Sequence, residues 1–374
     1  MNIGFDAKRL FNNFTGLGNY SRFVVQALIQ HAPDNGYVLY TPAVRKHPEI
    51  DPIVFAKKVT VVQPSATYTF FKASGLWRTW GIAKEDSIKS LQVYHGLSQE
   101  LPVGLPATIR KIVTVHDLIF LRFPKLYSSI DVRIYKTKVI KACQSADVVV
   151  AISQQTAQDL MDFLNVPESK IKVVYQGCHP QFLKNVSGEE ILGVKAKYRL
   201  PKRYLLNVGT IETRKNIMLA VKALALLPPA GRLPLVVLGK ETSYKAEVVT
   251  KAIELGVSDA VIFLHGAVFS DFPAIYQGAD LFIYPSLFEG FGIPLVEALE
   301  SGVPVITSMG SCFQEAAGPD AVYVDPTNEE ELAFQINRVL TDYDLRHQMI
   351  ASGKRFTKKF SSLSIAQDLL EIYK

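Results

Sequence analysis

Short apolar runs of strand length alternate along the chain with stretches in which apolar residues recur every three or four positions. This alternation is typical of βαβ units, whose strands form a parallel sheet. A first series of expected strands covers residues 2–6, 37–40, 59–62, 93–95, 111–116, 147–153 and 171–176. A second series covers residues 204–208, 233–238, 260–264, 281–284, 303–307 and 321–324. The pattern therefore predicts an α/β protein with two Rossmann-like, doubly wound domains.

A polar stretch separates the two series and gives the expected domain boundaries. We expect an N-terminal domain over residues 1–178, a linker with a short helix over 179–202, and a second domain over 203–355. A chain of 374 residues is too long for one ordinary core and suits two domains of roughly 150 to 200 residues each.

Composition and charge limit the class of protein. No apolar run approaches the ~18 residues of a membrane-spanning helix, and Asp6, Lys8 and Arg9 stand where a signal peptide would have its apolar core. We therefore expect a cytoplasmic protein. The three cysteines lack metal-site spacing, so reduced, buried thiols are expected. The net charge is +6, but both signs are interspersed without a nucleic-acid motif, and we expect no nucleic-acid partner.

One segment, residues 68–84, combines aromatic with basic side chains. It could lie peripherally at the inner face of an anionic membrane, with its rings among the headgroups and its cations on the lipid phosphates. The alternative is a helix whose aromatic residues pack into the N-terminal domain. Basic residues within 133–141 fall on more than one side of a helix and do not decide between the two. The segment's aromatic and basic members include Phe70, Phe71, Lys72, Trp77, Arg78, Trp80 and Lys84.

A glycine-rich turn follows the expected strand 281–284 and precedes an expected helix over 294–301. Pro294 suits the first helical position, and Gly302 is a natural left-handed residue after the helix. Residues 303–307 then form the next buried strand, which completes a βαβ unit. The turn therefore lies at the carboxyl end of a parallel strand, where open α/β sheets bind ligands.

The chemistry of this turn suits a phosphorylated sugar. Gly290 and Gly292 allow close approach of the backbone, so the N–H groups around Phe291 and Ile293 could hold a diphosphate at the helix N-terminus. Glu289 lies before the helix, whereas Glu297 lies within its first turn or just beyond. Two carboxylates on one junction favour binding, one to the sugar and one to ribose hydroxyls, over a glycosidase pair that flanks the scissile bond.

The E-x7-E pattern from Glu289 to Glu297, with G-F-G-I-P inside it, resembles the signature of the retaining family-4 glycosyltransferases, the glycosyl transferases group 1. The resemblance extends over nearly the whole chain. It implies the GT-B fold, in which an N-terminal acceptor-side domain and a C-terminal nucleotide-sugar donor domain, both Rossmann-like, face a central cleft that holds the chemistry. It also implies that the last helix, about residues 356–374, packs back on the first domain.

Two glycines at the start of an expected helix provide a second candidate phosphate contact. They lie in T-G-L-G-N-Y, and the resemblance assigns Gly16 and Gly18 to a loop that folds over the donor phosphates. Taken alone, this G-x-G could equally be a dinucleotide fingerprint or a tight turn.

The expected strand 111–116 carries His116 and Asp117 at its carboxyl end. A lone histidine on an apolar strand is more often a core residue. The resemblance implies that His116 donates a hydrogen bond to a hydroxyl of the transferred sugar. Asp117 then either orients the ring or caps the next turn, and His95 is expected to be structural or on the acceptor side.

Two adjacent cations, Arg214 and Lys215, follow the first strand of the second domain and precede a helix. Basic side chains at a helix N-terminus oppose its dipole, so a departing nucleoside diphosphate explains them better than a structural role. Thr210 stands where the family often has arginine, and we include it among the donor contacts. By resemblance Gly239 and Val268 line the base and diphosphate pocket. The alternative is that both belong to ordinary turns between a strand and a helix.

The resemblance implies a retaining hexosyltransferase. We expect it to need no metal and no cofactor, because the histidines are scattered without ligand spacing. The G-L-G-N-Y, V-H-D-L and G-T-x-E-x-R-K-N variants resemble mannosyltransferase-like members that build surface polysaccharides. GDP-mannose is the leading donor, followed by UDP-sugars, and a glycan or lipid-linked glycan is the acceptor. The alternatives are an NAD-dependent Rossmann oxidoreductase, a non-enzymatic sugar-binding protein, and another GT-B enzyme such as a sugar epimerase.

Overall fold

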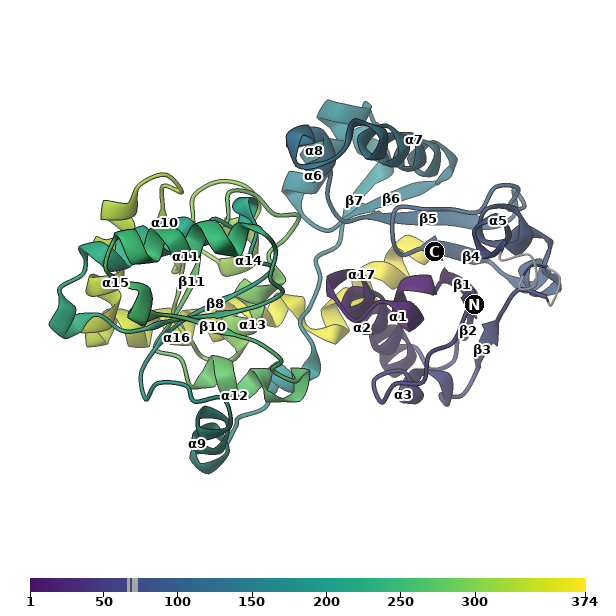
Figure 1. The fold of residues 1–374 in the computed structure, drawn as a ribbon. Helices are drawn as coiled ribbons and strands as arrows, with labels where there is room; N and C mark the ends of the chain where they lie inside the picture. The colour runs from purple at the N-terminus through teal and green to yellow at the C-terminus, as the bar shows by residue number, and fades with distance from the viewer. Residues whose placement is uncertain (66–67, 69–72) are drawn as a thin grey trace. The chain divides into compact units, whose positions relative to one another are not determined.

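The computed structural model describes residues 1–65, 68 and 73–374. The chain forms two compact units (Figure 1). The first unit comprises Met1–Gly177 together with Phe360–Lys374, and the second comprises Cys178–Lys359. Each unit is built around its own parallel sheet, as expected for a pair of Rossmann-like domains.

The first unit has a seven-stranded sheet in the order β3-β2-β1-β4-β5-β6-β7. Its strands are β1 (Asn2–Asp6), β2 (Gly36–Tyr40), β3 (Val59–Val62), β4 (Val93–Gly96), β5 (Arg110–Val115), β6 (Val148–Ala151) and β7 (Ile171–Val173). Its described helices are α1 (Lys8–Asn12), α2 (Gly16–His31), α3 (Asp51–Val54), α5 (Ser74–Leu76), α6 (Ile119–Arg122), α7 (Ser129–Ser145), α8 (Gln154–Leu164) and α17 (Ser362–Tyr373). The strand order reverses between β1 and β4.

The second unit has a six-stranded sheet in the order β10-β9-β8-β11-β12-β13. Its strands are β8 (Leu205–Val208), β9 (Leu235–Leu238), β10 (Val261–Leu264), β11 (Leu281–Tyr284), β12 (Val305–Ser308) and β13 (Val322–Val324). Its α-helices are α9 (Gly188–Lys197), α10 (Ile217–Leu226), α11 (Tyr244–Glu254), α12 (Phe272–Gln277), α13 (Ile293–Glu300), α14 (Phe313–Ala317), α15 (Glu329–Thr341) and α16 (Tyr343–Phe356). Here the order reverses between β8 and β11.

The apolar runs become strands because both faces of each sheet are covered. All four residues of β11 are buried, as are all four of β8 and of β9. A parallel strand that is covered on both faces reads as a continuous apolar run. In the second unit α10 and α15 pack side by side, and their buried residues join those of β8, β9 and β11 in one core (Figure 1).

All the expected strands are present. Strands β1, β3 and β11 have the expected bounds, and the others are shifted at one or both ends. The largest shift is at β7, which ends at Val173 rather than at residue 176. The amide of Val174 still donates to the carbonyl of Ala151, after which the pairing with β6 stops. Apolar character persists past the point where the neighbouring strand ends, so sequence alone overestimates such strands.

Two helix starts differ from expectation. Helix α13 begins at Ile293, so Pro294 is its second residue rather than its first, while Gly302 follows the helix with the expected positive φ of 72°. Gly16 and Gly18 are residues of α2 itself, not of a loop before it. A Cβ on Gly18 would come within 1.7 Å of the carbonyl oxygen of Asn13, so Gly18 is required by the tight turn between α1 and α2.

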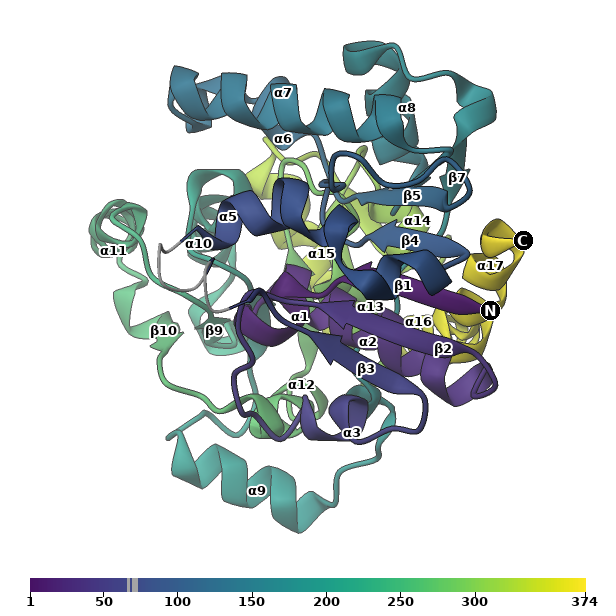
Figure 2. The same cartoon turned by 90° about the vertical axis from the view of Figure 1, so that its right-hand side faces the viewer.

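The last helix packs within the first unit. Helix α17 lies against α2 (Figures 1 and 2). Ser362 bonds His31 at 3.0 Å, and Arg110 Nε donates to the carbonyl of Ile372 at 2.7 Å. The hydroxyl of Tyr373 bonds His95 Nδ1 at 2.7 Å, inside the protein. Side-chain and backbone contacts therefore fix both ends of this helix.

Candidate active site

The reversal of strand order in the second unit lies between β8 and β11, and ligands of open α/β sheets bind at such a reversal. The loop after β8 contains the short helix Thr213–Lys215, followed by Asn216 in the left-handed conformation with a φ of 54°. The side-chain Nδ2 of Asn216 donates to the carbonyls of Pro285 and Pro326, at 3.1 and 2.8 Å. These bonds tie the loop after β8 to the loop after β11.

The two loops bring together Arg214, Lys215 and Glu289. Arg214 Nη1 lies 2.9 Å from one carboxylate oxygen of Glu289, and Lys215 Nζ lies 2.6 Å from the other. The three side chains are only 13%, 15% and 10% exposed. Arg214 also donates to the carbonyl of Phe288 at 2.6 Å and pairs with the more exposed Glu212 at 2.6 Å. Two cations therefore hold one buried carboxylate.

Electrostatics keep all three groups charged. Burial would raise the pKa of Glu289, but Lys215 and Arg214 outweigh it and hold this pKa below its ordinary value. Burial would likewise lower the pKa of Lys215, but Glu289 raises it above the ordinary value. The buried cluster carries one net positive charge, which suits it to an anionic ligand.

Tyr284, the last residue of β11, was not predicted as a site residue. Lys215 Nζ donates to its hydroxyl at 2.7 Å, and the tyrosine is buried. Burial, and next the charge of Glu289, raise the pKa of Tyr284 above its ordinary value, so the hydroxyl stays neutral. The signal in the sequence is positional, because Tyr284 is a polar-tipped residue at the carboxyl end of the strand that leads to Glu289.

Glu297 occupies a different environment. It lies in the second turn of α13, buried, and accepts a hydrogen bond of 2.7 Å from the hydroxyl of Tyr276. Burial raises its pKa to about 7 despite this hydrogen bond. The structure therefore gives the two glutamates separate partners, and the predicted contact of Glu297 with ribose stays a prediction.

The turn between the two glutamates is fixed by buried groups. Phe291 is buried, and Gly292 has a φ of 92°, a conformation that favours glycine. The amide of Glu289 donates to Ser311 Oγ at 3.2 Å, and Cys312 Sγ donates to the carbonyl of Glu289 at 3.3 Å. The backbone from Gly290 to Ile293 thus leads directly into α13, as the anion-binding prediction requires.

Three other residues of this unit were predicted to contact the nucleotide-sugar donor, and they differ in burial and in their neighbours. A Cβ on Gly239 would lie 1.8 Å from the carbonyl oxygen of Gly209, so close approach of two strand ends accounts for this glycine. Thr210 is half-buried after β8. Val268 is exposed, and its amide donates to the hydroxyl of Tyr198 at 3.2 Å. Their contacts with a donor stay predictions.

In the first unit His116 follows β5 and is buried. Its Nε2 bonds the carbonyl of Leu97 at 2.8 Å, and the ring of Tyr20 packs edge-on with a centroid distance of 4.6 Å. Burial lowers the pKa of His116 to about 4, so the ring is neutral. Since a carbonyl only accepts, the proton is on Nε2 and Nδ1 is an acceptor. In this tautomer Nδ1 would accept from a sugar hydroxyl, and the predicted hydrogen bond donated by His116 stays a prediction.

The neighbours of His116 have structural roles. One carboxylate oxygen of Asp117 accepts from the amide of Ile119 at 3.1 Å, which is the turn-capping alternative. His95 bonds Thr114 at 2.8 Å and Tyr373 at 2.7 Å, and burial lowers its pKa to about 3. His95 is therefore a neutral core residue that links β4 and β5 to α17.

The aromatic and basic segment of the first unit is divided. Trp77 is fully buried among apolar residues and donates from Nε1 to Glu85 at 2.7 Å, whereas Trp80 is 51% exposed. Trp77 therefore packs into the first unit, as the alternative to membrane contact predicts. Phe70, Phe71 and Lys72 lie outside the described residues. Contact with a membrane stays a prediction, and no helix among the described residues is long and apolar enough to cross a bilayer.

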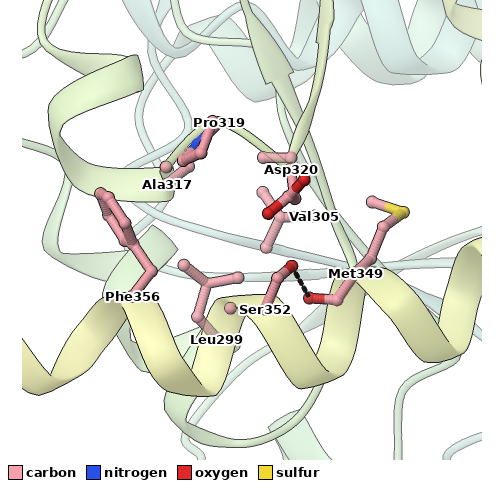
Figure 3. Close-up of a pocket in the computed structure, with 11 residues that line it drawn as sticks. Leu299, Val305, Ala317, Pro319, Asp320, Met349, Ser352 and Phe356 are labelled. Carbon is pink, nitrogen blue, oxygen red and sulfur yellow. Dashed lines mark hydrogen bonds between the residues drawn. The ribbon is translucent and has the colours of Figure 1, made fainter.

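The second unit also has a small pocket away from the cation cluster. Figure 3 shows a pocket of the second unit, between α13 and α16, that encloses about 10 Å³, room for one water at most. It is too small for a substrate. In the parts of the chain that the structure describes, no three His, Cys, Asp or Glu side chains gather as metal ligands would.

The two parallel sheets and the cation cluster between β8 and β11 define a GT-B glycosyltransferase. Solved structures share the fold. The Anabaena protein Alr3699/HepE, solved with UDP and glucose, has a TM-score of 0.75 at 18% identity, over 99% of this chain and 98% of its own. WaaG, a glycosyltransferase involved in lipopolysaccharide biosynthesis, has a TM-score of 0.72 at 17% identity and full coverage of both chains.

Sequence comparisons define the family. Residues 20–182 match the model of Glycosyltransferase Family 4, and residues 193–356 match that of Glycosyl transferases group 1. O-antigen chain mannosyltransferase B of Escherichia coli is 30% identical over 286 residues, 75% of this chain and 74% of that protein. Serotype-specific mannosyltransferase WbdA of Escherichia coli is 27% identical over 76% of this chain, but over only 36% of its own length. The chain belongs to the group 1 glycosyltransferases.

Proposed function

We propose that this enzyme transfers mannose from GDP-mannose to a hydroxyl of a glycan or lipid-linked glycan, with retention at the anomeric carbon and without a metal ion. The observation that carries the proposal is the buried cluster of Arg214, Lys215 and Glu289 at the strand-order reversal. The mannosyltransferase relatives support mannose as the sugar. A UDP-sugar is the second candidate donor, since a neighbour in fold is solved with UDP.

The cation pair is suited to stabilise a leaving diphosphate. A cation about 4 Å from a phosphate contributes roughly 4 kcal/mol at an effective dielectric of 20. Negative charge grows on the diphosphate as the anomeric bond breaks, so Arg214 and Lys215 bind the transition state more tightly than the ground state. Two buried cations beside the diphosphate would do the work that a divalent metal does in metal-dependent transferases.

Glu289 and His116 are proposed to contact the sugar. The carboxylate accepts hydrogen bonds from sugar hydroxyls, and the imidazole accepts one more at Nδ1. Glu289 is ionised and its pKa is lowered, so it is a poor general base near neutral pH. We propose that the acceptor hydroxyl loses its proton to the departing phosphate oxygen while its oxygen forms the new bond to the anomeric carbon.

A thermal-shift series with GDP, UDP, ADP and NAD at equal concentration tests the donor class. A ligand present at ~100 times its dissociation constant stabilises by roughly 2.7 kcal/mol. Selective stabilisation by GDP is expected. Stabilisation by UDP instead would change the donor, and a response to NAD alone would favour the oxidoreductase.

The variant Lys215→Ala identifies the site of this binding. We expect its stabilisation by GDP to be lost. Lys222→Ala is the matched control, because Lys222 lies on α10 and pairs with the partly exposed Glu329, at 3.3 Å. Equal stabilisation of both variants by GDP would show that the nucleotide binds elsewhere.

A further inference from the structure

The first unit contains a cavity of about 460 Å³ that none of the predicted catalytic or donor-binding residues lines. This volume is within the range of small-ligand sites. Its lining residues come from α7, the turn that follows α5, and the loop after β4. Figure 2 labels α5, α7 and β4. Its lining residues with a role below are Asp6, Arg78, Trp80, Glu100, Arg133 and Lys141.

The position of the cavity follows from the topology of the sheet. Asp6 is the last residue of β1, and Glu100 lies in the loop that follows β4. The strand order of the first unit reverses between these two strands. The cavity therefore lies at the carboxyl ends of the strands that mark the reversal, where an open α/β sheet binds its ligand.

The inner wall of the cavity carries balanced charges. Arg78 pairs with Asp6 at 2.5 Å and with Glu100 at 2.6 Å, and Lys138 pairs with Glu100 at 3.0 Å. The buried Nε of Arg78 has no hydrogen-bond partner within the described chain. Burial would lower the pKa of Arg78, but Asp6 and Glu100 raise it, so the guanidinium is always charged.

The outer wall carries unbalanced charges. Arg133 and Lys141 also line the cavity from α7, and both are exposed. The structure pairs neither of them with a carboxylate of any described residue. The lining thus has four cations and two carboxylates, a surplus of two positive charges.

The remaining wall of the cavity is apolar. Trp80, Val103 and Ile134 line it and are 51%, 53% and 45% exposed. Leu101 and Pro102 extend the same wall. Large apolar side chains that stay exposed around a cavity mark a binding site for an apolar group.

We propose that this cavity binds the acceptor through a phosphate attached to a hydrocarbon chain. The hydrocarbon contacts Trp80, Val103 and Ile134, and the phosphate pairs with Arg133 and Lys141. A free sugar would leave the apolar wall and the surplus cations without partners, whereas an amphiphilic anion uses both. The role as acceptor site rests on the proposed function, but binding by the cavity does not.

Titration of the full-length protein with geranyl phosphate tests the proposal, with Trp80 fluorescence and calorimetry as readouts. Geraniol and inorganic phosphate are the two half-ligands. We expect geranyl phosphate to bind at least tenfold more tightly than either. Equal binding of inorganic phosphate, or no binding of geranyl phosphate, would overturn the proposal.

Variants of α7 locate the binding. The double variant Arg133→Ala, Lys141→Ala should bind geranyl phosphate at least tenfold more weakly. Lys136→Ala should bind normally, because Lys136 is exposed on the same helix but does not line the cavity. Stabilisation by GDP, which depends on the second unit, should be unchanged in both. If GDP stabilises the protein and geranyl phosphate does not bind, the cavity proposal fails while the proposed function stands. If geranyl phosphate binds and GDP does not stabilise the protein, the proposed function fails while binding by the cavity stands.

Vesicles of phosphatidylglycerol and phosphatidylcholine distinguish a lipid surface from a single bound molecule. We expect the double variant to lose binding to the vesicles while Lys136→Ala keeps it. We also expect geranyl phosphate to release the bound protein from the vesicles. If Lys136→Ala lost vesicle binding to the same extent, and geranyl phosphate did not bind the protein, the contact would be with a bilayer surface. That result would overturn the cavity proposal.

Discussion

The two units place opposite charge patterns at equivalent positions of their sheets. At the reversal in the second unit, two buried cations hold one carboxylate, Glu289. At the reversal in the first unit, one buried guanidinium, Arg78, holds two carboxylates. The same topology thus produces a buried triad with surplus positive charge in one domain and, at the base of a cavity in the other, a triad with surplus negative charge that Lys138 neutralises. The fold provides the position, and the loop residues determine which ligand each position takes.

Removing the central carboxylate of the second unit should have the largest effect. Glu289→Ala should abolish transfer and destabilise the protein by about 3 to 5 kcal/mol, because two buried cations lose their partner. Glu289→Gln keeps the shape and should lower the transfer rate by about 100-fold or more. Transfer assays and thermal unfolding measure the two effects, with the more exposed Glu212→Ala as control. A near-normal rate in Glu289→Gln would contradict the assignment.

Removing the central cation of the first unit should affect stability but not nucleotide binding. Arg78→Ala leaves the buried Asp6 without its guanidinium, whereas the partly exposed Glu100 keeps Lys138, and we expect a loss of about 3 kcal/mol at neutral pH. In the native protein burial would raise the pKa of Glu100, but Arg78 and Lys138 hold it below the ordinary value of 4.5. The stabilisation is therefore present above pH 4.5 and lost as pH falls.

The variant's deficit should thus shrink in acid, where its carboxylates become protonated. Thermal unfolding between pH 4 and pH 8, with and without GDP, measures both effects. A deficit that is constant over this range, or a loss of GDP binding, would show that the two clusters do not act separately.

The two glutamates of the E-x7-E pattern should respond to pH with opposite sign. The pKa of Glu297 is raised to about 7 from an ordinary 4.5, so its contribution to stability is present below pH 4.5 and lost as pH rises through 7. Glu297→Gln cannot ionise and should gain about 3 kcal/mol on the native protein across this window. The stability of Glu289→Gln should instead fall furthest below that of the native protein at neutral pH. Unfolding curves at pH 5 and pH 8 compare them, and equal pH responses would contradict the separate environments.

The smallest expected effect is that of Tyr284→Phe, which removes one hydrogen bond to Lys215. A hydrogen bond of about 1 kcal/mol corresponds to a rise of roughly fivefold in the dissociation constant for GDP. Tyr244→Phe, on α11, is the control. Unchanged GDP affinity in Tyr284→Phe would remove this tyrosine from the site.

Local signals explain what could be predicted from the sequence. The strands could be placed because buried parallel strands are continuous apolar runs, and the loops with Glu289 and Arg214 because glycine and charge follow such runs. Contacts between distant segments left no local signal. The partner of Glu297, Tyr276, lies 21 residues away on another helix.

The same reason applies to the first unit. The cavity joins residues from β1, the turn after α5, the loop after β4 and α7, which no periodicity connects. Gly18 is required by the tight turn before α2, and its contact with a phosphate stays a prediction, because a glycine required by packing and a glycine required by a ligand look alike in sequence.

The chain leaves the first unit at Gly177 and returns to it at Phe360. A Cβ on Gly177 would lie 2.4 Å from the carbonyl oxygen of Phe360, so the outgoing and returning segments touch at a position that only glycine fits. The ribosome therefore completes every residue of the second unit before it supplies α17. During synthesis, residues 178–359 can fold first, while β4, β5 and the ring of His95 wait for Tyr373 to close their core.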